Sequence, residues 1–244
     1  KTLVQRALSE FAGIPRPVIA HRLMGTWTPS ASWFEGLLAE DETDADVSRP
    51  YPFYLAHPLD TEPEDTFGAR ADWQVEYKWD GIRAQLVRRR GATYLWSRGE
   101  ELVTDRYPEV AEASKSLPDG TVLDGELLAW RDDAPLPFAV MQRRIGRKRV
   151  GKKLLREAPV RFMGYDLLEV EGADVRELPL TDRRTRLEAI LEGAPPTLMT
   201  SPIVAKPGWA ELEELRATSR ERGVEGFMVK RKASPYRAGR KRGD

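Results

Sequence analysis

One short stretch, residues 76–84, constrains this chain more than any other part of its sequence. Lys78 is followed by an aspartate, a glycine and then Arg83, and the runs on both sides alternate between apolar and polar residues as strands do. A glycine near a strand end lets another backbone or a phosphate come close. A lysine that lies near other cations and away from water loses its proton more easily and becomes a nucleophile. The stretch therefore predicts two strands that present a reactive lysine beside a nucleotide.

Composition sets the size and the broad class. The chain has 244 residues, 41% hydrophobic and 32% charged, enough for one large domain or one and a half. It has no apolar run near the ~20 residues of a membrane span and no signal-peptide pattern. It has no cysteine, and its two histidines, His21 and His57, lie far apart, so cysteine or histidine catalysis is not expected. A cytoplasmic protein without membrane contact is the simplest expectation.

Charge is spread unevenly although the formal net charge is zero. The segment 41–65 is acidic, whereas lysines and arginines gather at 143–156 and again at 230–242. Basic clusters on a neutral chain suit a polyanion such as DNA or RNA, although charge runs are also common in solvated loops. We expect these two clusters to bind phosphates without reading bases.

Periodicity divides the chain into a helical beginning and a mixed remainder. Three helical stripes open the chain, at 3–11, 18–24 and 31–38, and Ser30 is the expected N-cap of the third. The acidic stretch 41–70 is rich in proline and predicts a connector, extended at its prolines, in which 52–56 packs on the next domain.

Beyond residue 70 the patterns of strands and helices are mixed. The expected strands are 73–78, 84–90, 93–97, 121–129, 161–168 and 226–231, and a hairpin is expected at 90–92. The expected helices are 107–116, 181–192 and 209–222. Runs of strands with helices between only some of them predict an antiparallel-rich α+β domain.

The stretch around Lys78 resembles motif I of the covalent nucleotidyltransferases, which are ATP-dependent DNA ligases, RNA ligases and mRNA capping enzymes. Four later fragments resemble further motifs of this family, in the family's order: 96–100, 122–127, 162–168 and 224–230. Each fragment alone is weak, since an acid beside a glycine is more often a turn. Their order behind Lys78 makes the chain similar to an ATP-dependent DNA ligase of the long bacterial form, truncated at both ends.

The resemblance implies a catalytic role for Lys78, which would attack the α-phosphate of ATP and carry AMP as a lysyl phosphoramidate. It also implies nucleotide contacts. Arg98 would meet the phosphate or sugar, Glu126 would lie near the ribose, and Tyr165 would stack on the base. Glu76, or the backbone beside it, would accept a hydrogen bond from the adenine amino group.

Cations and carboxylates complete the implied site. Arg83, Arg98 and Lys230 would stabilise the charge that develops on the phosphoryl oxygens. Mg²⁺ prefers carboxylate oxygens, and Glu126 and Glu225 are the expected ligands. Arg242 resembles an arginine that precedes one more motif of the family.

The same resemblance implies the domain organisation and the partner. Residues 1–60 would be the C-terminal part of a helical DNA-binding domain plus a connector. Residues 61–244 would be an ATP-grasp-like adenylation domain, truncated before its last motif and the OB-fold domain. The expected partner is nicked double-stranded DNA, joined in replication, repair or recombination, and we expect a monomer that seals nicks poorly.

Three alternatives stay open at this point. An RNA ligase or capping-type transferase shares the motifs, although helices at 1–40 favour DNA. An NAD-dependent ligase is disfavoured because the zinc-binding cysteines are missing. A non-catalytic DNA-binding fragment would keep the motif residues only as relics.

Overall fold

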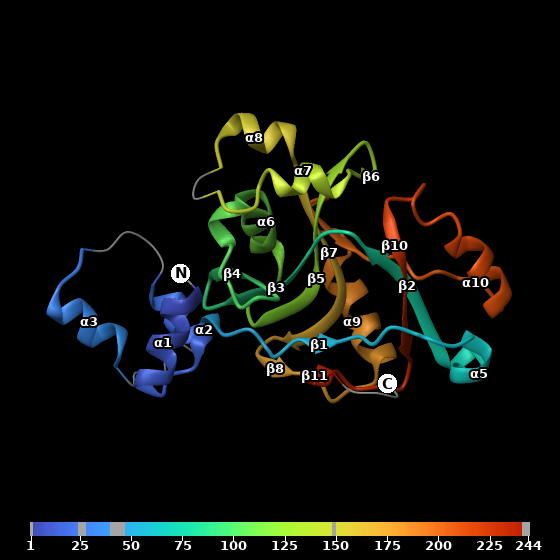
Figure 1. Cartoon of the computed structure of the whole chain (residues 1–244), viewed down its shortest axis with the longest axis horizontal. Coiled ribbons are helices and arrows are strands. Elements are labelled where there is room, and N and C mark those ends of the chain that lie inside the picture. The colour runs from blue at the N-terminus through green and yellow to red at the C-terminus, as the bar shows by residue number, and fades with distance from the viewer. Residues whose placement is uncertain (1, 24–27, 40–46, 148–149, 241–244) are drawn as a thin grey trace.

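A curled, mainly antiparallel sheet forms the centre of the molecule. The computed structural model describes residues 2–23, 28–39, 47–147 and 150–240 (Figure 1). Within them, a seven-stranded sheet follows the order β4-β3-β5-β7-β8, with β6 beside β5 and β9 beside β7. Its strands are β3 (Ile82–Arg89), β4 (Ala92–Ser97), β5 (Thr121–Arg131), β6 (Ala134–Pro135), β7 (Val160–Val170), β8 (Ala173–Asp174) and β9 (Leu198–Thr200). Within this seven-stranded sheet of the described residues, the pairing of β7 with β9 is parallel and the others are antiparallel, so the antiparallel-rich α+β prediction is confirmed.

Two smaller sheets flank the central one. β2 (Trp73–Trp79) pairs with β10 (Val224–Arg231) in antiparallel fashion, and β1 (Tyr54–Leu55) pairs with β11 (Gly239–Arg240) in parallel fashion. All six strands expected beyond residue 70 are present, within a few residues of their expected ends. The expected hairpin is also present: Arg90 and Gly91 both have positive φ, and the carboxylate of Asp119 accepts hydrogen bonds from their two backbone N–H groups.

Helices cover the sheets and begin the chain (Figure 1). α9 (Leu180–Leu191) packs on β7 and β9, and α6 (Pro108–Ala113) packs near β4 and β7. The other helices are α1 (Thr2–Ala12), α2 (Arg16–Arg22), α3 (Ala31–Leu37), α5 (Pro63–Phe67), α7 (Phe138–Gln142), α8 (Lys152–Glu157) and α10 (Trp209–Arg216), with 3₁₀ turns at Arg70–Asp72, Thr104–Arg106 and Ser114–Ser116. The structure confirms Ser30 as an N-cap, since its hydroxyl accepts a hydrogen bond from the backbone of Trp33. No helix among the described residues is long and apolar enough to cross a membrane.

The structure corrects two predictions, one about the end of a helix and one about the connector. α10 ends at Arg216 and not at residue 222, because the hydroxyls of Thr218 and Ser219 donate back to the carbonyls of Leu215 and Arg216 in tight turns. The connector is not extended at Pro63, which instead opens α5, where its missing N–H costs nothing. The end of the second N-terminal stripe, at residue 24, lies outside the described residues.

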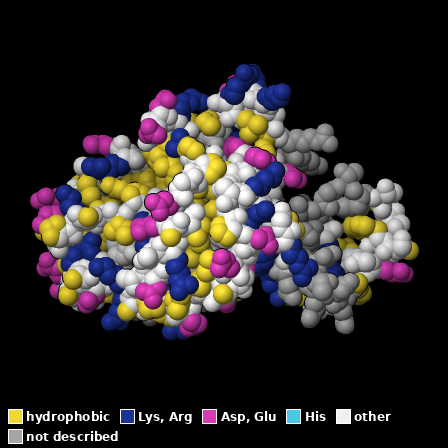
Figure 2. Space-filling model, turned by 180° about the vertical axis from the view of Figure 1, so that it is seen from behind, with side chains coloured by type: hydrophobic (Ala, Val, Ile, Leu, Met, Phe, Trp, Pro, Cys, Tyr) yellow, Lys and Arg dark blue, Asp and Glu magenta, His cyan; other side chains and the backbone are white. Residues whose placement is uncertain are grey.

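The basic run 143–156 divides into a structural part and an exposed part. Arg144 is fully buried and binds Glu109 and the carbonyls of Arg106 and Ala158, so the expectation that it faces phosphates is wrong. A buried arginine needs such partners to offset the loss of hydration. Arg143 and Arg147 are exposed before α8, and three more exposed cations lie on α8, near the top of the molecule in Figure 2, where lysine and arginine side chains gather. We call Lys152, Lys153 and Arg156 the α8 cations.

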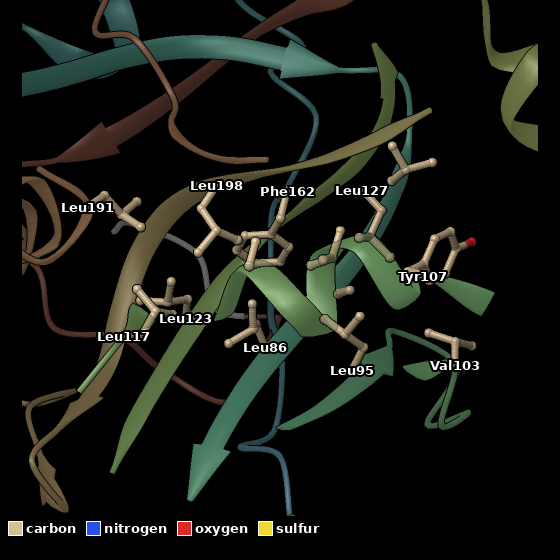
Figure 3. Packing of buried hydrophobic residues seen from close by; sticks show 14 of the residues in the cluster. Leu86, Leu95, Val103, Tyr107, Leu117, Leu123, Leu127, Phe162, Leu191 and Leu198 are labelled. Atoms are coloured by element: carbon tan, nitrogen blue, oxygen red, sulfur yellow. The ribbon is translucent and has the colours of Figure 1, made fainter. Parts of the chain in front are cut away.

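The main core lies between the central sheet and the helices on it (Figure 3). Leucines dominate it, joined by Phe162 and Tyr107: Leu86, Leu95, Leu117, Leu123, Leu127, Leu191 and Leu198. A second cluster under β2 and β10 contains Trp73, Val75, Val204, Trp209 and Leu212. These two cores hold the two sheets that meet at the site described below.

Tight packing inside the central sheet leads to a prediction about Gly125. A methyl group at Gly125 would lie 2.5 Å from Cζ of Phe162 and 2.6 Å from the carbonyl oxygen of Met163. We expect Gly125→Ala to lower the free energy of unfolding by about 2 kcal/mol, because a well-packed core resists added volume. The measurement is urea unfolding, with Gly99→Ala as the control, since its nearest neighbour would be Ser97 Oγ at 3.8 Å. Equal stability of the two variants would contradict this packing argument.

Candidate active site

Lys78 lies at the end of β2, where the two sheets meet. Its side chain is 49% exposed and forms an ion pair with the carboxylate of Glu225. A bulge in β10 explains this contact: Val224 pairs with Trp79 and Gly226 pairs with Lys78, so Glu225 is the extra residue. Gly226 has a φ of 146°, a conformation that suits glycine. The bulge therefore brings an acid to a lysine that is 147 residues away in the sequence (225 − 78).

The glycine that follows Lys78 brings this turn against β5. A Cβ atom on Gly81 would lie 2.5 Å from the carbonyl oxygen of Leu127 and 2.8 Å from Cγ of Glu126. Only a residue without a side chain fits between the β2–β3 turn and β5. The close approach sets Lys78 near Glu126, whose carboxyl is influenced by the lysine's charge.

Arg83 is held by an acid that the sequence argument did not select. It lies directly opposite Glu126 in the sheet, yet its guanidinium donates two hydrogen bonds to Asp124, at 3.2 and 2.7 Å. Asp124 is fully buried and also accepts a hydrogen bond from the hydroxyl of Tyr236, at 2.7 Å. Although burial opposes the charge, the adjacent Asp124 raises the pKa of Arg83, so the guanidinium is always charged.

Glu126 is partly buried beside these charges. Among the described residues its carboxylate accepts no hydrogen bond. Burial raises the pKa of Glu126 to about 8, with a further contribution from the negative charge of Asp124, while Arg83, Lys78 and Arg98 oppose the rise. A partly buried carboxyl group without a hydrogen-bond partner has capacity for a ligand that supplies a cation or a hydroxyl.

A second group of predicted residues lies along β2 and β10. The buried carboxylate of Glu76 accepts hydrogen bonds from Lys230 Nζ and Gln74 Nε2, both at 2.7 Å. Lys230 lies 4.7 Å from the ring centre of Tyr165, and Arg83 lies 5.9 Å from it. The ring is therefore flanked by two of the predicted phosphate-binding cations.

Arg98 is less closely tied to Lys78 than the residues above. Arg98 is exposed, and its backbone N–H donates to the carbonyl of Arg83 at 3.1 Å. Its side chain borders a cavity of about 710 Å³ that the connector residues 49–53 also line. Arg242 lies outside the described residues.

The structure thus brings Lys78, Glu225, Glu126 and Arg83 together and adds residues that the sequence argument missed. Asp124 carried a signal, because it lies two residues before Glu126 and must share its face of the strand. Tyr236 carried none, whereas Phe53, whose ring lies 5.2 Å from the Arg83 guanidinium, lies in the stretch 52–56 that was predicted to pack on the next domain. Both come from segments far from β5 in the sequence.

The fold and the site define the class. A lysine at the end of a strand, between carboxylates and fixed cations and at the junction of two antiparallel sheets, is the arrangement of a nucleotidyltransferase catalytic domain. The comparisons with known proteins give the family. The family described as "ATP dependent DNA ligase domain" matches residues 54–244. The chain belongs to the ATP-dependent DNA ligase family.

Relatives in sequence carry the same description. A probable DNA ligase of Koribacter versatilis is 35% identical over 79% of this chain and 37% of its own length. A probable DNA ligase of a Nocardioides species is 33% identical over 98% of this chain and 46% of its own length. The chain therefore spans less than half the length of these relatives.

Solved structures agree on the fold. The mycobacterial DNA ligase D complexed with ATP and MES is 29% identical and has a TM-score of 0.60, over 78% of this chain and 56% of that one. The Chlorella virus DNA ligase-adenylate is 18% identical, over 78% of this chain and 64% of that one, and its TM-score of 0.57 shows the shared fold.

The raised pKa of Glu126 predicts a pH-dependent effect on stability. Its pKa in the folded chain, about 8, is above the ordinary value of 4.5, so the folded state holds the proton more tightly. The stability that this group contributes is complete below pH 4.5 and is lost as the pH rises towards 8. Glu126→Gln imitates the protonated form and escapes that loss. We expect its melting temperature to exceed that of the unmodified chain by several degrees at pH 8 and by little at pH 5.

Melting curves at the two pH values test this. Glu112→Gln is the control, because Glu112 lies on the exposed face of α6 in an ion pair with Lys115. If Glu126→Gln raises the melting temperature equally at both pH values, the charge of Glu126 is not the source of the increase.

Proposed function

We propose that this chain is the catalytic part of a DNA ligase and that Lys78 is its nucleophile. Lys78 takes AMP from ATP, AMP then passes to the 5′-phosphate at a nick in duplex DNA, and the 3′-hydroxyl of the nick displaces AMP to join the strands. Such joining serves replication, repair or recombination. Family membership supports the proposal, as do the solved relatives, one complexed with ATP and another in its adenylate form.

One observation carries the proposal: the setting of Lys78. Its side chain is half exposed at a strand end, in contact with Glu225 and close to Glu126 and Arg83. A lysine that only stabilised the fold would not need a bulge and a glycine packed against backbone to hold it at the junction of two sheets. An exposed side chain fixed at this junction can reach a bound nucleotide, which a covalent nucleophile has to do.

The first step can be written for the residues present. The neutral Nζ of Lys78 attacks the α-phosphorus of ATP, a P–N bond forms, and the bond to the bridging oxygen breaks. Pyrophosphate leaves with the electron pair, and the extra proton on nitrogen passes to solvent. Arg83, Arg98 and Lys230 offset the negative charge of the phosphates. In the unliganded chain Glu225 holds Lys78 as an ion pair, so this pair has to separate before attack.

Magnesium fits the residues at this site. Mg²⁺ is commonly held by one or two carboxylates together with substrate phosphates and water. Glu126, buried without a hydrogen-bond partner among the described residues, and Glu225, the acid next to the nucleophile, would hold it. No group of three or more histidine, cysteine, aspartate or glutamate side chains placed to hold a metal occurs in the described part of the chain. When bound, the metal neutralises phosphate charge.

The adenosine contacts belong to the same proposal. Tyr165 offers a ring for the base, and Glu76, or the backbone beside it, offers an acceptor for the adenine amino group. The contact of Lys230 with both residues supports a single pocket for base and phosphate. Arg242 stays a predicted phosphate ligand.

The domain division, monomeric state and cytoplasmic location also stay proposals. The helical part, residues 1–60, is supported by α1, α2 and α3. The catalytic part, residues 61–244, is supported by the family match, which begins at residue 54.

The central experiment is labelling with α-³²P-ATP and Mg²⁺, followed by denaturing electrophoresis. We expect label on the unmodified chain and none on Lys78→Arg, because a guanidinium keeps its proton and cannot attack. Lys115→Arg is the matched control, since Lys115 is an exposed lysine paired with Glu112. Undiminished labelling of Lys78→Arg would remove Lys78 from the mechanism. An unlabelled wild-type chain would favour the non-catalytic alternative.

The second experiment concerns the DNA. The α8 cations are exposed members of the basic run and suit sequence-independent binding to phosphates. We expect binding of a nicked duplex to weaken steeply with salt. Replacing all three with glutamine should reduce the slope of log affinity against log salt by about two to three, near one for each cation that no longer binds a phosphate.

The control removes the same charge elsewhere. The control uses exposed arginines: Arg186 lies on α9, and Arg220 and Arg222 lie in the turns after α10. Fluorescence anisotropy at several salt concentrations compares the two triple glutamine variants. If both slopes fall equally, α8 is not a preferred contact surface.

A further inference from the structure

The connector between the N-terminal helices and the sheet lies directly on the catalytic unit. Gln85, fully buried in β3, pairs with both backbone groups of Tyr51: it accepts from the N–H at 2.7 Å and donates to the carbonyl at 2.9 Å. The hydroxyl of Tyr51 donates to Glu169 at 2.8 Å, and Glu169 in turn binds Arg89. The two hydrogen bonds with Gln85 involve only the backbone of Tyr51, and they hold the connector in one position on β3.

Three residues further on, the connector reaches the site. The backbone N–H of Tyr54 donates to the hydroxyl of Tyr236 at 3.0 Å. That hydroxyl donates to Asp124 at 2.7 Å, and Asp124 accepts both hydrogen bonds from Arg83. The ring of Phe53 lies 5.2 Å from the same guanidinium. We call this chain of contacts, from Tyr54 through Tyr236 and Asp124 to Arg83, the Arg83 relay.

The direction of the hydrogen bonds in the Arg83 relay follows from the single proton of the Tyr236 hydroxyl. A phenolic hydroxyl has one proton to donate. Because Tyr236 accepts from the Tyr54 N–H, which can only donate, its own proton is directed to Asp124. Asp124 is fully buried, and its partners decide where its two oxygens lie. The position of Arg83 therefore depends on the backbone of the connector.

We propose that the connector takes part in catalysis by positioning Arg83. Tyr236 and Phe53 are positioning residues. Tyr236 orients Asp124, which binds Arg83, and its hydroxyl also accepts a hydrogen bond from Arg83 itself at 3.5 Å. Phe53 covers the guanidinium so that it faces the nucleotide. The inference rests on the proposed adenylation of Lys78. It adds that the segment leading from the N-terminal helices is built into the chemical site, so that a shift of the connector changes the rate at which Lys78 is adenylated.

Single-turnover adenylation over a range of ATP concentrations tests the relay. Tyr236→Phe removes only the hydroxyl, and we expect the maximal rate to fall about tenfold or more while the melting temperature stays within a few degrees. Phe53→Leu should act in the same direction. Tyr51→Phe is the matched control: it removes another connector hydroxyl, which is bound to Glu169 and lies outside the relay, and we expect a rate within twofold of the unmodified chain.

A double-mutant cycle separates positioning from general structure. If Tyr236 acts through Arg83, then Tyr236→Phe should slow an Arg83→Lys chain by less than twofold, because the end point of the relay is already missing there. If the rate reductions of Tyr236→Phe and Arg83→Lys multiply in the double variant, the inference is overturned. Equal slowing by Tyr236→Phe and Tyr51→Phe would overturn it too. Either result leaves the proposed function intact. Absence of label on the unmodified chain would overturn the proposed function and the inference together.

Discussion

The close approach of the turn after Lys78 to β5 is the contact on which the rest of the site depends. Because Gly81 has no side chain, the turn rests on the carbonyl of Leu127 and on Glu126. The same contact joins the small β2–β10 sheet to the central sheet, since β2 runs through this turn into β3. Each sheet has its own apolar cluster, and Lys78 lies where they meet. Backbone packing therefore sets the place at which Lys78, the proposed nucleophile, leaves β2.

Around that junction three acids are each paired with a cation. Glu225 contacts Lys78, Glu76 binds Lys230, and Asp124 binds Arg83, so each of these acids is matched with a cation. Glu126 has no such partner among the described residues, and burial raises its pKa to about 8. A folded chain tolerates such a group where a ligand compensates it. In the proposed function that ligand is the metal–nucleotide complex.

Arginines elsewhere show that the same residue type serves different purposes. Arg144 and Arg183 are buried and bind Glu109 and Asp166, linking elements that are distant in the sequence. Asp166 is the neighbour of Tyr165, so its pairing with Arg183 also holds the end of the site on β7. Among the described residues, the exposed α8 cations form no such ion pair with a distant element. Counting basic residues along the chain cannot distinguish these cases, because it contains no information on burial.

The sequence by itself determined the strands, most helices, the antiparallel class and the lysine motif, since alternation, turn glycines and local spacing are properties of adjacent residues. The resemblance of its motifs to those of the nucleotidyltransferases also indicated the family. Only the tertiary structure decided which acids meet which cations: Arg83 binds Asp124 although Glu126 lies opposite, and Glu225 reaches Lys78 through a bulge. Likewise, Tyr236 and the connector enter the site from segments far away along the chain. Strand register and long-range packing make these contacts, and neither is written in the spacing of neighbouring residues.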